Sequence, residues 1–158
     1  MKNGATTVWE RWDSWTPDKG FNPEGMNSFN HYAYGSVIGW FYDTIAGLKP
    51  DATAPGWKSF HISPTPGGGL TNAKASVETP FGVTASDWKI AGEKFELAAT
   101  VPANTTARIS LLAAAETDVT ENGHPLSELR ARDVRRENGR VSFTVPAGSY
   151  KFSTPAPK

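Results

Sequence analysis

Short alternating stretches separated by turn residues fill the chain from residue 57 onward, and this pattern constrains the fold more than any other feature. The apolar side chains of Phe95, Leu97 and Ala99 alternate with charged or smaller ones, which is the period of a strand with one buried face. Asn-Gly pairs at 122–123 and 138–139 tolerate the positive φ of hairpin turns. Several such strands predict a mainly β fold, an antiparallel β-sandwich.

The stretch MNSFNHYAYGSVIGWFYDTIAGL, ahead of the β region, has a helical period instead. We expect a long helix at about residues 27–47, capped by Asn27 or Ser28 and stopped by Gly47 and Pro50. Apolar residues cover nearly its whole circumference, so it should be buried among other helices. Only about 25 residues precede it, and they hold no set of helical partners. This mismatch indicates that part of the fold lies outside the chain.

The change of pattern near residue 50 predicts two domains. Residues 1–50 would form a helical segment and residues 51–158 the β-sandwich, with the join between Pro50 and Gly56.

Composition argues against several classes of partner. Lys plus Arg and Asp plus Glu number sixteen each, so no global field attracts nucleic acid or an anionic membrane. No apolar run approaches the roughly 18–20 residues that cross a bilayer, and the N-terminus lacks the plan of a signal peptide. We therefore expect a soluble protein of unknown compartment, with neither nucleic acid nor membrane as a partner.

Four arginines cluster near residue 130, but acidic residues interleave with them. We expect their charges to cancel locally on a solvated face rather than form a phosphate site. The arginines are Arg130, Arg132, Arg135 and Arg136, and the acidic residues are Glu128, Asp133 and Glu137.

Metal and cofactor sites find little support in the sequence. The chain has no cysteine, and its three histidines, His31, His61 and His124, do not have the spacing of a local metal motif. The glycines of PTPGGGL are not followed by Gly-Lys-Ser/Thr and open no helix, so they predict a tight connection between strands. We expect no metal and no cofactor.

The stretch TTVWERWDSW is the best candidate for chemistry. Trp9 and Trp12 lie beside the carboxylate of Glu10. Aromatic walls suit sugar rings, and glycoside hydrolysis needs carboxyl groups, but Glu10 could equally pair with Arg11 or a lysine. His31, in the first turn of the expected helix, could project into a cavity or simply pack.

Three long motifs together resemble the C-terminal end of bacterial α-L-rhamnosidases of glycoside hydrolase family 78. They are GATTVWERWDSW, MNSFNHYAYGSV and PGWKSFHISPTPGGGLTNAKASVETPFGVTASDWKI. The resemblance implies the end of an (α/α)6 barrel followed by a β-sandwich. It also implies that Glu10 is the general base of an inverting hydrolysis and that His31 contacts the sugar. Trp9 and Trp12 would be neighbours of that pocket.

The resemblance also implies that this chain is a fragment of an enzyme that releases terminal α-L-rhamnosyl residues from a rhamnose-containing glycan. The general acid of the family lies upstream of the matched motifs, so we expect this chain alone to be inactive. Two alternatives stay open. The sandwich could be a non-catalytic carbohydrate-binding or structural module with Trp57 or Trp88 as a stacking platform, unless these residues pack in the core. The exposed helix could also drive assembly of a homo-oligomer.

Overall fold

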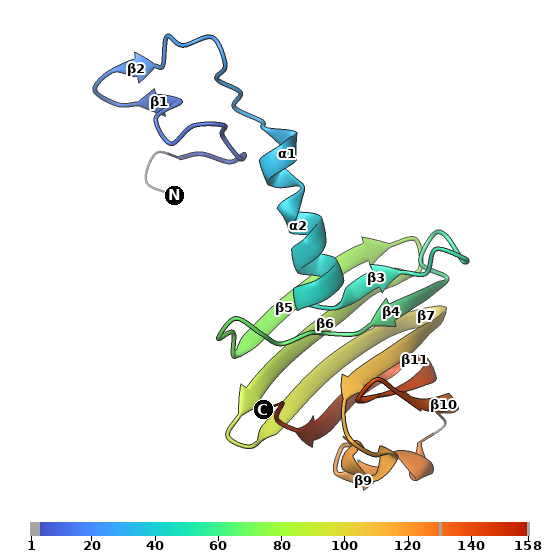
Figure 1. Ribbon diagram of the computed structural model, residues 1–158. Coiled ribbons are helices and arrows are strands. Elements are labelled where there is room, and N and C mark those ends of the chain that lie inside the picture. Colours follow the sequence, from blue (N-terminus) through green and yellow to red (C-terminus); the bar gives the residue numbers. More distant parts are fainter. Residues whose placement is uncertain (1–3, 130, 158) are drawn as a thin grey trace. The chain divides into compact units, whose positions relative to one another are not determined.

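The computed structural model describes residues 4–129 and 131–157. The chain divides into two compact units, one ending at Trp40 and the other starting at Phe41. Each unit is described by itself (Figure 1).

The first unit contains little regular structure. A two-stranded hairpin joins β1 (Trp15–Thr16) to β2 (Gly20–Phe21), and two short helices follow, α1 (Tyr32–Gly35) and α2 (Val37–Trp40). Ser14 is the one buried residue among the described residues of this unit. The unit therefore depends on hydrogen bonds more than on an apolar core.

The helical stretch is shorter than expected and is interrupted. It begins at Tyr32 instead of residue 27, and after α2 the chain forms a π-helical turn, η1 (Phe41–Ile45). His31 is the N-cap of α1, with its Nδ1 accepting a hydrogen bond from the Tyr34 N–H at 3.3 Å. The hydroxyl of Ser36 donates to the Ala33 carbonyl at 2.7 Å, a bond that competes with the backbone ladder of a helix.

The second unit is a nine-stranded, hydrogen-bonded sheet in the described part of the chain (Figure 1). Its strands are β3 (Leu48–Pro50), β4 (Ser59–Ile62), β5 (Asn72–Thr79), β6 (Gly82–Ala91), β7 (Lys94–Leu112), β8 (Thr120–Glu121), β9 (His124–Pro125), β10 (Arg132–Glu137) and β11 (Arg140–Pro155). Two short 3₁₀ turns, η2 (Glu116–Asp118) and η3 (Leu126–Glu128), lie next to β8 and β9. The expectation of a mainly β fold is confirmed.

The long strands β7 and β11 run through two halves of this sheet. The first half contains β5 and β6, and the second half contains β3, β4 and β10. The first half of β7 pairs with β6, and its second half pairs with β4, while β11 follows β7 along nearly its whole length. The register of β11 shifts between Pro146 and Gly148, where the two halves meet. The β4–β7 pair is parallel, and β5, β6 and the first half of β7 lie between the two paired segments in the sequence. One pair thus departs from the expected antiparallel arrangement.

Side chains from both halves meet in one core. Its largest fully buried members are Phe60, Trp88, Phe143 and Phe152. The indole of Trp88 is completely buried, so Trp88 cannot serve as a stacking platform for a sugar. Trp57 lies just before β4 at a positive φ of 65° and packs against Phe60.

Two side chains of β6 fix the segment that leads into β3. Trp88 Nε1 donates to the Ile45 carbonyl at 2.7 Å, and Ser86 Oγ donates to the Ala46 carbonyl at 2.6 Å. The next residue, Gly47, has a φ of +73° and lies against the backbone of Ser63 and Pro64. The end of the helical stretch is therefore anchored to the sandwich.

Candidate functional site

Glu10 is held by a reciprocal pair of hydrogen bonds to Ser28. The Glu10 N–H donates to the Ser28 carbonyl, and the Ser28 N–H donates to Glu10 Oε2, each at 2.8 Å. Arg11 does not pair with Glu10, because its guanidinium bonds Glu24 at 3.0 Å and the Met26 carbonyl at 2.8 Å. Glu10 therefore has no cationic partner among the described residues. Its Oε1 accepts no hydrogen bond within the described ranges and can accept one from water.

The segment that carries Glu10 lies beside the segment that leads into α1. The His31 N–H donates to the Val8 carbonyl at 2.8 Å, and the Thr7 hydroxyl donates to the Phe29 carbonyl. Together with the Glu10–Ser28 pair, these bonds hold the two sequence motifs side by side. The structure thus brings Glu10 and His31 onto adjacent segments of one unit.

The ring of His31 has one nitrogen engaged and one available. Nδ1 accepts from the Tyr34 N–H, and the ring lies against the Tyr34 ring with 4.1 Å between centroids. In a neutral imidazole, a nitrogen that accepts a hydrogen bond leaves the proton on the other nitrogen. Nε2 of His31 can therefore donate to a ligand hydroxyl.

The two tryptophans that flank Glu10 differ in their surroundings. Trp9 is half-buried and meets Phe29 edge to face, with 5.0 Å between centroids. Phe29 in turn packs against Phe21 at 5.6 Å. The side chain of Trp12 is fully exposed. Trp9 therefore packs within the unit, and Trp12 offers both faces of its ring.

Asn27 is a structural residue, although the sequence predicted it as a helix cap. Its Nδ2 donates to the carbonyls of Ser14 and Asn22, at 3.1 and 3.3 Å. Its buried Oδ1 has no hydrogen-bond partner in the described part of the chain. Asn27 links the hairpin to the segment that carries Ser28. No local pattern distinguishes such an asparagine from a helix cap, which is the role we expected for it.

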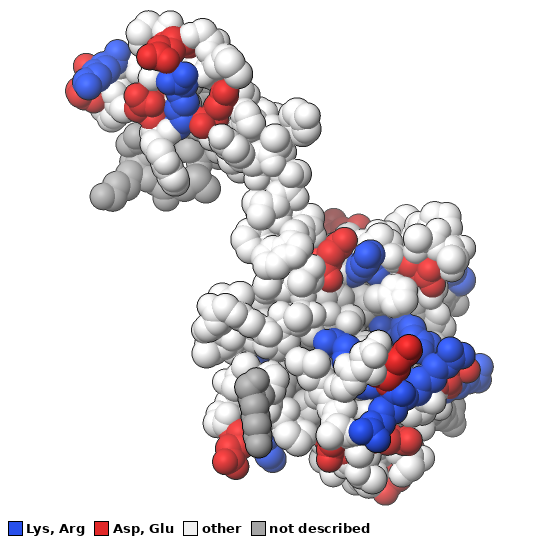
Figure 2. All heavy atoms as spheres, in the orientation of Figure 1, with Lys and Arg blue, Asp and Glu red and all other residues white. Residues whose placement is uncertain are grey.

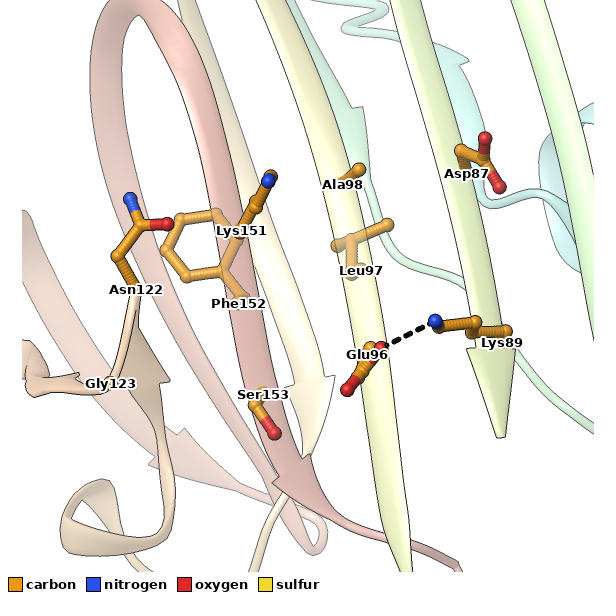
Figure 3. Close-up of a pocket in the computed structure, with 10 residues that line it drawn as sticks. All are labelled: Asp87, Lys89, Glu96, Leu97, Ala98, Asn122, Gly123, Lys151, Phe152 and Ser153. Atoms are coloured by element: carbon orange, nitrogen blue, oxygen red, sulfur yellow. Dashed lines mark ion pairs between the residues drawn. The ribbon is translucent and has the colours of Figure 1, made fainter. Parts of the chain in front are cut away.

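A hollow of the second unit lies over β6, β7 and β11 (Figure 3). Its volume is about 540 Å³, and the small side chain of Ala98 lies between the strands that carry Asp87 and Lys151. Lys89 pairs with Glu96 at 3.0 Å across this hollow, and Asp87 pairs with Lys74 at 3.2 Å. None of the predicted site residues lies in it. Both of its carboxylates therefore form ion pairs with lysines.

The described residues contain no cluster of three or more His, Asp or Glu side chains that could hold a metal ion. Within the same residues, no helix has the length and apolar character needed to cross a membrane.

Two family models match successive parts of the chain. Residues 1–45 match the model of the bacterial alpha-L-rhamnosidase 6 hairpin glycosidase domain. Residues 47–124 match the model of the bacterial alpha-L-rhamnosidase C-terminal domain. The chain belongs to the bacterial α-L-rhamnosidase family. It corresponds to a C-terminal portion of these enzymes.

Individual α-L-rhamnosidases agree with this assignment. An enzyme of Formosa agariphila is 38% identical over 96% of this chain, and one of Streptomyces avermitilis is 41% identical over 97% of it. The chain spans only 16% and 14% of the lengths of these two relatives.

Solved structures match the fold. The structure of the Streptomyces avermitilis α-L-rhamnosidase complexed with L-rhamnose has a TM-score of 0.76 and 40% identity, covering 97% of this chain and 14% of that one. The α-L-rhamnosidase from Dictyoglumus thermophilum also has a TM-score of 0.76, with 33% identity over 98% of this chain and 17% of that one.

Proposed function

We propose that this α-L-rhamnosidase region supplies the general base, Glu10, for the inverting hydrolysis of terminal α-L-rhamnosyl residues from a rhamnose-containing glycan. The observation that carries the proposal is the state of the Glu10 carboxylate. One oxygen is oriented by the Ser28 N–H at 2.8 Å, and no described cation neutralises the group.

The chemistry requires two carboxyl groups on opposite faces of the scissile bond. A base takes a proton from water, which attacks the anomeric carbon as the leaving oxygen receives a proton from an acid. In inverting enzymes the two carboxyl groups stand roughly 6.5–9.5 Å apart, which leaves room for the water. Glu10 fits the base, because Oε1 can bind water while Oε2 stays fixed. We assign the acid to no residue of this chain.

His31 and the two tryptophans complete the proposed contribution of this region. His31 Nε2 would donate to a hydroxyl of the rhamnosyl ring, since Nδ1 is engaged by Tyr34. The exposed ring of Trp12 would stack on the sugar, and Trp9 would support the site through its contact with Phe29.

The proposal also assigns the two parts of the chain to two domains of the enzyme. Residues 1–50 would be the end of the catalytic helical barrel, and residues 51–158 the C-terminal β-sandwich. The two family matches support this division, because they meet between residues 45 and 47. We expect the 158-residue chain alone to leave an aryl α-L-rhamnoside intact, because a base without its acid loses most of the rate acceleration.

A second candidate function is self-association through the helical stretch. The described residues of this stretch include large apolar side chains that are exposed to solvent. Tyr32 has a relative exposure of 87% and Tyr34 one of 56%. Exposed apolar surface of this kind favours burial against a second copy. Light scattering on the purified chain tests this candidate, and a monomer at all concentrations would rule it out.

The test of the main proposal is a chimera. The matching region of the Streptomyces avermitilis enzyme, 41% identical, is replaced by this chain. We expect the chimera to hydrolyse an aryl α-L-rhamnoside, and Glu10→Gln to lower kcat by about 10²–10⁴-fold with little change in KM. Glu93→Gln, the same change at an exposed turn, is the control. Full activity of the Glu10→Gln chimera would refute the role of Glu10.

A further inference from the structure

A row of basic side chains crosses the outer face of the second half of the sandwich, the half that contains β3, β4 and β10. The strand register places Lys49 of β3 opposite His61 of β4, and His61 opposite Arg108 of β7. Arg108 is opposite Thr144 of β11, which is opposite Arg132 of β10. Residues paired in this way share one face of a sheet. The row thus crosses five strands, a span of about 19 Å at the usual spacing of ~4.8 Å.

Burial confirms which face the row occupies. His61 lies between the fully buried Phe60 and Ile62, so its own side chain points away from the core. Lys49 and Arg132 are exposed. Figure 2 shows Lys and Arg side chains gathered over this part of the second unit.

The next position on the same face adds a further cation. Arg135 is paired with Ser142, whose Oγ accepts a hydrogen bond from Arg108 Nη2 at 3.0 Å. The strand β10 is irregular between Arg132 and Arg135, and Asp133 has a φ of 53°. This bulge lets two arginines that are three residues apart lie on one face, where regular alternation would put them on opposite faces.

Carboxylates lie beside this row, since Glu137 of β10 is opposite Arg140, which is on the same face as Ser142. No ion pair found among the described residues includes Lys49, Arg108, Arg132 or Arg135. Asp51 lies near His61 and stays ionised, because two hydrogen bonds from Thr53, at 2.7 and 2.9 Å, and then the charge of His61 lower the pKa of its carboxyl group. Among the described residues, no ion pair joins Arg132 or Arg135 to the interleaved Asp133 or Glu137, and Arg130 of the predicted cluster lies outside these residues.

We propose that this basic row, defined by Lys49, His61, Arg108, Arg132 and Arg135, binds a linear anionic polysaccharide bearing carboxylate or sulfate groups. The occupant follows from charge and shape together. Guanidinium groups match the oxygens of such anions with two parallel hydrogen bonds, and a row of cations suits a chain with repeated charges. The surface lies in the second unit, whereas Glu10 lies in the first. The proposal thus goes beyond the hydrolytic site and assigns the sandwich a separate role in holding an acidic glycan.

Affinity measurements on the full 158-residue chain test this assignment. The probes are oligogalacturonate, which carries carboxylates, dextran sulfate, which carries sulfates, and uncharged dextran. We expect at least one acidic probe to bind and uncharged dextran not to bind. Binding should weaken by at least tenfold between about 50 and about 300 mM salt, because contacts between exposed charges are screened. The two acidic probes show which anion the row prefers.

Matched variants separate the row from simple net charge. The pair Arg132→Gln/Arg135→Gln should lower the affinity by about fivefold or more, and Lys49→Gln, at the far end, by about twofold. The control pair Lys94→Gln/Lys151→Gln removes two charges from the other half of the sheet, where both lysines are exposed. It should change the affinity by less than twofold. Thermal unfolding of each variant verifies that the fold is retained.

Several results would overturn the proposal. One is the absence of binding to either acidic probe at low salt, and another is an equal loss of affinity in the control pair. Tighter binding of a DNA oligonucleotide with the same dependence on Arg132 and Arg135 would assign the row to nucleic acid instead. None of these results depends on rhamnosidase activity in the chimera, so the two proposals fail independently.

Discussion

At the scale of single residues, Glu10 is oriented by backbone rather than by a charged partner. The Ser28 N–H holds Oε2, while Arg11 is occupied by Glu24. A neighbouring cation would stabilise the ionised carboxylate and weaken it as a base. The arrangement therefore fixes the direction of the carboxylate without adding a formal charge beside it.

Replacement of Gly47 should strongly destabilise the fold, even when the new side chain is a single methyl group. A Cβ at Gly47 would lie 2.1 Å from the Pro64 nitrogen and 2.2 Å from the Ser63 carbonyl carbon, and the residue has a φ of +73°. We expect Gly47→Ala to lower the free energy of unfolding by about 2–4 kcal/mol, because backbone cannot yield as a flexible side chain can. Urea denaturation monitored by tryptophan fluorescence measures this change.

Gly92 provides the matched control. It also has a positive φ, +61°, but a Cβ there would meet nothing within 4 Å. Gly92→Ala should therefore cost only about 1 kcal/mol, the price of the backbone conformation alone. Equal losses in the two variants would show that the close approach at Gly47 does not contribute.

The sequence marks candidate site residues by their type, but it does not mark the residues that hold them in place. Glu10 and His31 stand out because a carboxylate among tryptophans and a histidine near a helix start are recognisable patterns. Ser28 acts through its backbone N–H, which any residue possesses, so no sequence pattern marks it. Asn27 was expected as a cap, yet its amide bonds the carbonyls of Ser14 and Asn22, 13 and 5 residues earlier in the chain.

At the scale of elements, the helical stretch shows how tertiary hydrogen bonds override periodicity. The apolar spacing predicted one helix from about residue 27, but residues 27 and 28 are drawn into contacts with the preceding segment. His31 then caps a helix that starts at Tyr32. The spacing of apolar residues cannot reveal these competing hydrogen bonds, because the partners of residues 27 and 28 are 13 and 18 residues away in the chain.

The local sequence pattern predicted the positions of the strands better than it predicted which strands pair. Alternation and Asn-Gly turns predicted the hairpins, and both Asn122 and Asn138 adopt positive φ. The parallel β4–β7 pair could not be predicted, because it joins segments separated by two whole strands. The basic row was also hidden, since it depends on register across five strands and on the bulge in β10.

Tyr150 gives β11 a pH-dependent contact. Its hydroxyl donates to the Pro146 carbonyl at 2.8 Å, across the bend in the strand. Burial, and to a lesser degree the charge of Glu121, raise the pKa of Tyr150 above its ordinary value of 10.0. The folded state therefore favours the neutral phenol. Its contribution to stability is complete below pH 10 and is lost as the pH rises through the folded-state pKa.

Tyr150→Phe should lower the free energy of unfolding by about 1 kcal/mol at neutral pH, since one hydrogen bond is lost. The difference from the wild-type chain should shrink above about pH 10. Denaturation at a series of pH values measures both effects. Tyr34→Phe is the control, because no hydrogen bond of its hydroxyl is found in the described part of the chain. A difference between Tyr150→Phe and the wild-type chain that stays constant to high pH would contradict the assigned role of the phenol.

At the scale of the whole molecule, stability is distributed unevenly between the two units. Every buried apolar residue of the described chain lies at or beyond Ala46, whereas the first unit buries Ser14 alone. Burial of apolar surface is the main favourable contribution to folding. The second unit should therefore be the stable one.

Hydrogen exchange followed by mass spectrometry measures this difference directly. We expect the amides of residues 4–31 to exchange at least about a hundredfold faster than those of β7 and β11, because local opening of the first unit exposes little apolar surface. Equal protection in the two regions would contradict the inferred weakness of the first unit.

The central claim is that Glu10 activates the attacking water, and azide rescue tests it most directly. In the chimera, Glu10→Ala should abolish hydrolysis of an aryl α-L-rhamnoside and leave space for a small anion on the water side of the sugar. Azide needs no base, so it should attack the anomeric carbon as the aryl group leaves. The account predicts restored turnover with β-L-rhamnosyl azide as the product. Hydrolysis by Glu10→Ala at the unaltered rate, or an azide product of retained configuration, would contradict it.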